Sequence, residues 1–98
     1  MLREPIEADD ASQLIDELID VFVSRRHGRP DAQAMLRARG ALARLTAIDP
    51  DGDAGEALDQ LAMHAELLFG ETAGETRDRD LVRVAALATI GELRAVLF

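Results

Sequence analysis

Three aspartates stand on alternate positions beside a glycine in the segment IDPDGDAGEALDQ, residues 48–60: Asp49, Asp51, Asp53 and Gly52. Alternating carboxylates near a glycine are the pattern with which an EF-hand loop binds Ca²⁺. Such a loop also needs a glycine at its sixth position and a bidentate glutamate at its twelfth. Counted from Asp49, these positions hold Ala54 and Gln60. The spacing therefore does not predict a calcium site.

The same segment has the sequence of a turn between two helices. Pro50 disfavours helical geometry at Asp49, and DPDG places proline and glycine where a β-turn favours them. Asp53 then stands where an N-cap is expected, and Glu56 completes a capping box three residues later. We interpret the segment as the end of one helix and the start of the next.

The chain offers few other groups for catalysis or metal binding. It has two histidines and no cysteine. A di-iron bundle needs Glu-x-x-His pairs, but Leu61 stands three residues before His64. No glycine-rich phosphate loop is present. We expect no enzyme, no metal and no cofactor; an alternative is a small-ligand pocket between helices, lined by Met35, Met63 and His64.

The one dense basic cluster is RRHGR, residues 25–29. Arg25, Arg26 and Arg29 are candidates for binding an anion or an acidic partner segment, because guanidinium forks match carboxylates and phosphates. The other interpretation is structural, since cations near the C-terminus of a helix stabilise its dipole. The sequence leaves both interpretations open.

Four segments carry apolar residues at helical spacing, at about residues 10–26, 32–48, 54–68 and 77–97. Gly28 and Pro30 are expected to end the first, and Gly70 the third. Short connections make neighbouring helices antiparallel. The sequence therefore predicts an all-α four-helix antiparallel bundle that forms a single domain over residues 1–98, with residues 1–8 loosely ordered.

Two further residues carry local expectations. Gly40 lies inside the second helix, which suggests either a close helix contact or a local break. Thr76 is the expected N-cap of the last helix.

Charge is sorted along the chain, whose net charge is −8. Residues 21–48 hold six Arg and one acid, whereas residues 49–75 hold eight acids and no Arg. A positive second helix between two negative helices would complement both; alternatively, the acidic faces meet a basic protein partner. The acidity disfavours nucleic acid and acidic membranes as partners.

Composition and hydropathy also bear on where in the cell the protein is located. Every basic side chain that carries a full charge is Arg, a composition typical of a GC-rich bacterial genome. The longest uncharged apolar run, residues 84–90, is too short to span a bilayer. The first residues lack the pattern of a signal peptide. We expect a cytoplasmic protein without membrane contact.

The last predicted helix is apolar over a wide arc. One stripe contains Leu81, Ala85 and Ala88, and a second stripe contains Val82, Ala86, Ile90, Leu93 and Leu97. Such a helix should sit centrally or also face a second subunit. Val96, Leu97 and Phe98 add an apolar patch at the end of the chain, and such patches mark interfaces. We expect a homodimer through this helix, with help from the first helix and with Gly91 allowing close approach. The alternative is that the other three helices wrap this helix completely and leave a monomer.

These features predict a small, non-catalytic, acidic protein–protein interaction module, acting as an adaptor, regulator or inhibitor. In size and acidity alone, the chain resembles the colicin immunity proteins, which bind basic nucleases. It has no tyrosine and so lacks their tyrosine-pair motif. The alternatives are a small-ligand-binding bundle and an accessory subunit of an enzyme complex.

The first prediction concerns calcium. Adding Ca²⁺ is expected to leave the thermal midpoint of unfolding unchanged, because the loop lacks the glycine and the glutamate that complete a site. Thermal unfolding with and without Ca²⁺ measures the midpoint, and calorimetric titration measures binding. A dissociation constant tighter than roughly 10⁻⁴ M, the range of weak extracellular modules, would contradict the interpretation as a turn.

Overall fold

The computed structural model describes residues 6–24, 29–49 and 52–98. Its helices are α1 (Ile6–Ser24), α2 (Ala32–Ala47), α3 (Gly55–Phe69) and α4 (Arg79–Leu97), with a short 3₁₀ turn, η1 (Ala73–Glu75), before α4. The described residues contain no strand. The predicted all-α four-helix bundle is confirmed.

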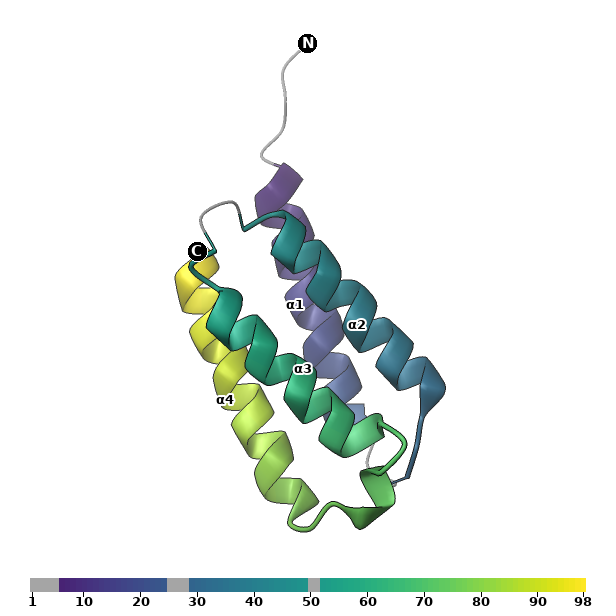
Figure 1. The fold of residues 1–98 in the computed structure, drawn as a ribbon. Helices are drawn as coiled ribbons and strands as arrows, with labels where there is room; N and C mark the ends of the chain where they lie inside the picture. Colours follow the sequence, from purple (N-terminus) through teal and green to yellow (C-terminus); the bar gives the residue numbers. More distant parts are fainter. Residues whose placement is uncertain (1–5, 25–28, 50–51) are drawn as a thin grey trace.

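Successive helices run in opposite directions (Figure 1). Each helix packs on two neighbours, in the pairs α1–α2, α2–α3, α3–α4 and α4–α1. At the lower end in Figure 1, α1 and α3 finish while α2 and α4 begin. At the upper end lie the turn between α2 and α3 and the C-terminus. The four helices therefore enclose one core, which on α1 extends from Ala11 to Phe22.

The core is built from apolar residues at helical spacing on all four helices. Its larger members are Leu14, Ile15, Leu18, Val21, Phe22, Leu42, Leu45, Leu58, Leu61, Leu68, Phe69, Ile90 and Leu93. The rings of Phe22 and Phe69 meet with their centroids 5.7 Å apart, which joins α1 to α3 across the bundle. Of the two stripes predicted on the last helix, the one with Leu81 and Ala88 stays outside the core, because both residues are exposed.

The helix boundaries differ from the predicted ones at both ends of the chain. α1 already begins at Ile6, four residues before the predicted start, whereas the loose order expected of residues 1–8 stays a prediction. α4 begins at Arg79 and not at residue 77, because Asp78 has a left-handed backbone with φ of 54°. Thr76 does not cap α4; its hydroxyl donates to the Leu67 carbonyl at 2.6 Å. Thr76 thus ties the loop to the end of α3.

The turn between α2 and α3 is present, but Asp53 is not its cap. Ala54 is the N-cap residue of α3 and makes no side-chain capping bond. The carboxylate of Asp49 instead accepts a hydrogen bond from the Ala54 N–H at 2.9 Å. Gly52 has φ of 74°, a conformation that favours glycine. The prediction for Asp53 is therefore wrong, because the capping carboxylate comes from the start of the turn and Asp53 is exposed.

The structure tests the expectations for two helix glycines, Gly40 and Gly70. Gly40 is exposed with open space around it, and α2 continues through it. Neither the close contact nor the break expected there exists. Gly70 ends α3 as predicted, but the reason is steric: a Cβ there would lie 2.6 Å from the Glu66 carbonyl oxygen.

Ion pairs join α2 to both neighbours, as the charge pattern predicts. Arg37 of α2 lies 3.5 Å from the Glu17 carboxylate and 3.3 Å from that of Asp20, both on α1. Arg39 of α2 pairs with Glu66 of α3. All of these side chains are solvent-exposed to a large extent, and such pairs contribute about 0–1 kcal/mol each. They set which helices are neighbours more than they stabilise the bundle.

The second prediction tests the cap. Replacing Asp49 by Ala is expected to lower the free energy of unfolding by about 1 kcal/mol, because the buried end of α3 loses its acceptor. Asp53→Ala should change it by less than about 0.5 kcal/mol, as an exposed substitution does. Urea denaturation measures both. Equal losses for the two variants would contradict the assignment.

Candidate functional site

The most prominent surface feature lies on α4, on the side that faces away from the bundle. Leu81 is 67% exposed and Val84 is 62% exposed. Ala88, Gly91 and Ala95 are also exposed. We call these five residues the outer face of α4. It is apolar, and no described residue of the chain covers it.

The spacing of the outer face is regular. Its five members follow one another at intervals of three, four, three and four residues, and exposed Phe98 continues the series. This is the a/d spacing of a coiled-coil seam. Over two heptads such a stripe drifts around the helix by only about 20° per heptad, so it presents a nearly continuous apolar line to whatever packs on it. The spacing thus indicates a surface suited to a second helix.

Arg83 fixes which side of α4 faces outward. Its side chain is almost fully buried, and its Nε donates to the Phe22 carbonyl oxygen at 3.0 Å. That carbonyl is in the last turn of α1, where helical partners run out. A second Arg83 nitrogen donates to Asp80. Arg83 lies two positions after Leu81, roughly 160° around the helix, so anchoring Arg83 to α1 turns Leu81 to solvent.

The C-terminal residues predicted to form a dimer interface do not share one surface. Leu97 is half-buried and packs against the core. Val96 and Phe98 are exposed, on either side of it. Helical geometry separates residues two apart by roughly 160°, so Val96 and Phe98 point to different sides. Of the three, Phe98 alone continues the outer face.

The basic cluster is only partly described. Arg25 and Arg26 lie outside the described residues. Arg29 is exposed and precedes α2. The prediction of an anion site at Arg25, Arg26 and Arg29 stays a prediction.

The residues expected to line a ligand pocket do not come together. Met35 borders a surface groove between the start of α2 and the end of α3, which neither Met63 nor His64 lines. Met63 is 55% exposed. Burial lowers the pKa of the half-buried His64 imidazole, because desolvation disfavours its charged form. Its Nδ1 has no hydrogen-bond partner, so His64 lacks the orienting carboxylate of a catalytic base.

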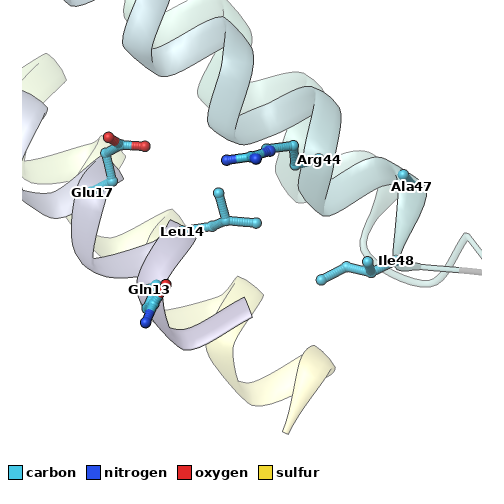
Figure 2. A pocket seen from close by; sticks show the side chains of 6 residues that line it. All are labelled: Gln13, Leu14, Glu17, Arg44, Ala47 and Ile48. Atoms are coloured by element: carbon cyan, nitrogen blue, oxygen red, sulfur yellow. The ribbon is translucent and has the colours of Figure 1, made fainter. Parts of the chain in front are cut away.

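A shallow groove of about 490 Å³ lies between α1 and α2 near the upper end of the bundle. Figure 2 shows Arg44 extending from α2 towards α1, with Leu14 and Ile48 pointing into the space between the helices. Gln13 and Glu17 line its α1 side. The Glu17 carboxylate is already paired with Arg37. The groove offers one cation above an apolar floor and no pair of groups arranged for catalysis.

Within the described residues, no three His, Cys, Asp or Glu side chains are grouped closely enough to hold a metal ion. None of the described helices combines the length and apolarity that crossing a membrane requires. Comparison with protein families, curated proteins and solved structures finds no match to this chain.

The outer face was only partly apparent from the sequence. The stripe expected there, Leu81, Ala85 and Ala88, shares two residues with it. The heptad spacing from Leu81 to Ala95 is a signal in the sequence that identifies the rest. No local signal indicates the role of Arg83, because its partner lies 61 residues earlier in the chain.

The third prediction concerns Arg83. Arg83→Met keeps most of the apolar stem but removes the donors, and leaves the Phe22 carbonyl unpaired in a buried place. We expect a loss of about 2–3 kcal/mol in the free energy of unfolding, as for hydrogen bonds made by charged groups. Urea denaturation gives the value.

Arg79→Met is the matched control. Arg79 is an exposed arginine of the same helix whose bond to the Thr76 carbonyl lies on the surface. It should cost less than about 0.5 kcal/mol. A similar cost for both variants would show that Arg83 is not the anchor of α4.

Proposed function

We propose that this protein is a small, non-catalytic interaction module that binds a partner through the outer face of α4. The observation that supports this most strongly is the exposure of Leu81 and Val84 within a regular apolar stripe. Leaving such side chains in water forfeits about 1.5–3 kcal/mol each relative to burial. A contiguous exposed apolar patch on a folded domain is typical of an interaction surface.

Two further features support a binding role over catalysis. His64, the one histidine among the described residues, has an unpartnered Nδ1, so no partner orients it as a catalytic base. The charge outside α4 is strongly acidic, with eight acids and no Arg over residues 49–75. A basic protein is the heterologous partner that this charge favours. An adaptor, regulator or inhibitor has these properties.

The fourth prediction tests the surface. The double variant Leu81→Ser/Val84→Ser should keep the helicity and the thermal midpoint, because both side chains are exposed. It should lose partner binding at least about tenfold, as removal of anchor residues does. The assay compares proteins retained from the source cells by the wild type and by the variant.

Leu36→Ser is the control, since Leu36 of α2 is 73% exposed but lies outside the stripe. It should retain partners as the wild type does. If the double variant keeps both self-association and every captured partner, the outer face is not the functional surface.

A further inference from the structure

The interaction function proposed above needs a partner, and this inference rests on it. We propose that the partner of the outer face is a second copy of this chain, packed antiparallel about a two-fold axis as a short coiled coil of two α4 helices. Four features of α4 lead to this arrangement: its spacing, the charges that flank the stripe, the sizes of its residues and its net charge.

The heptad spacing defines which residues flank the seam. The a positions of the heptad are Leu81, Ala88 and Ala95, and the d positions are Val84 and Gly91. The residues directly before the a positions form one flank, which consists of Asp80, Leu87 and Arg94. The opposite flank consists of Ala85 and Glu92. Residues at these flanks decide orientation and register in coiled coils.

The flanking charges select the antiparallel orientation. In an antiparallel pair, each flank faces the same flank of the other helix. Asp80 of one copy then faces Arg94 of the other, twice in the dimer, with Leu87 facing its own counterpart at the axis. In a parallel pair, unlike flanks face each other, and Leu87 meets Glu92 without any pair of opposite charges. Asp80 and Arg94 are both exposed, so both can reach a second copy.

The same register fits the sizes of the seam residues. When Asp80 lies opposite Arg94, Leu81 lies beside Gly91 of the other copy and Val84 beside Ala88. Each large side chain thus meets a small residue. Nothing in the chain lies within 4 Å of a Cβ built on Gly91, so the space beside it is open to a neighbour. Because a large side chain meets a small residue in each of these layers, the two helices can approach closely.

Net charge favours α4 as the place where two copies meet. Residues 76–98 hold four Arg and three acids, whereas residues 1–20 hold one Arg and seven acids. In a two-fold contact through any other segment, that segment meets itself, so like charges face each other. The layers that pair in this register, from Leu81 to Gly91, span about 15 Å, so the interface is at the small end for specific complexes. A dissociation constant on the order of micromolar is expected.

Sedimentation of the purified chain tests the inference across roughly 1–100 µM, a range that brackets a micromolar constant. The wild type should shift to twice its mass of 10.7 kDa. Gly91→Leu should abolish the shift, because it fills the seam. Gly40→Leu is the matched control, since Gly40 is also an exposed mid-helix glycine with open space around it. It should dimerise normally.

Charge reversal tests the orientation. Asp80→Arg and Arg94→Asp should each weaken the dimer about tenfold or more, since like charges then face each other. The double variant should recover most of the affinity. Within one copy, Asp80 is paired with Arg83. A guanidinium nitrogen of Arg94 lies 3.6 Å from the Asp16 carboxylate. The double variant does not restore these contacts, so recovery reports the pairing between copies.

Two results would overturn the inference. One is a monomer at every concentration. If the capture of another protein still depends on Leu81 and Val84, this result refutes the second copy as the partner but leaves the proposed interaction function standing. The other is a dimer unaffected by Gly91→Leu, or charge variants whose double substitution fails to recover. Either would show that two copies do not meet in this way.

Discussion

The bond between the buried Arg83 guanidinium and the Phe22 carbonyl is the interaction on which the arrangement of α4 depends. A buried guanidinium without partners would be costly, so the position of Arg83 against the end of α1 is strongly constrained. Because side chains project from a helix at fixed angles, anchoring this one residue sets the rotation of the whole helix. Ile90 and Leu93 consequently face the core, and Leu81 and Val84 face solvent.

Other contacts reinforce the same end of the bundle. Directly beside Phe22, the ring of Phe69 joins α3 to α1, and the Phe69 carbonyl accepts from the Asp31 N–H at 3.0 Å. Thr76 ties the following loop back to α3. All four helices are thus linked where α1 and α3 end. The opposite end depends on local turn chemistry at Asp49 and includes the open groove between α1 and α2.

The rotation of α4 decides which of its two apolar stripes stays on the surface. The bundle completes its core with one apolar stripe of α4 and leaves the other outside. The exposed stripe lies on the segment with the least net charge, while the acidic charge is concentrated elsewhere. The apolar stripe and the acidic charge therefore lie on different parts of the surface, and the proposed interaction would use the first without bringing two acidic segments together.

The sequence by itself determined the fold class, the number of helices and most of the core, because apolar spacing is a local property that each helix carries alone. It also predicted the ion pairs of α2, since they follow from the order of charged segments. It could not assign the capping role to Asp49 over Asp53, because that depends on the left-handed backbone at Gly52. Nor could it choose which of two apolar stripes of α4 enters the core. Only the tertiary structure decided that choice, since it depends on a contact between Arg83 and a carbonyl 61 residues away.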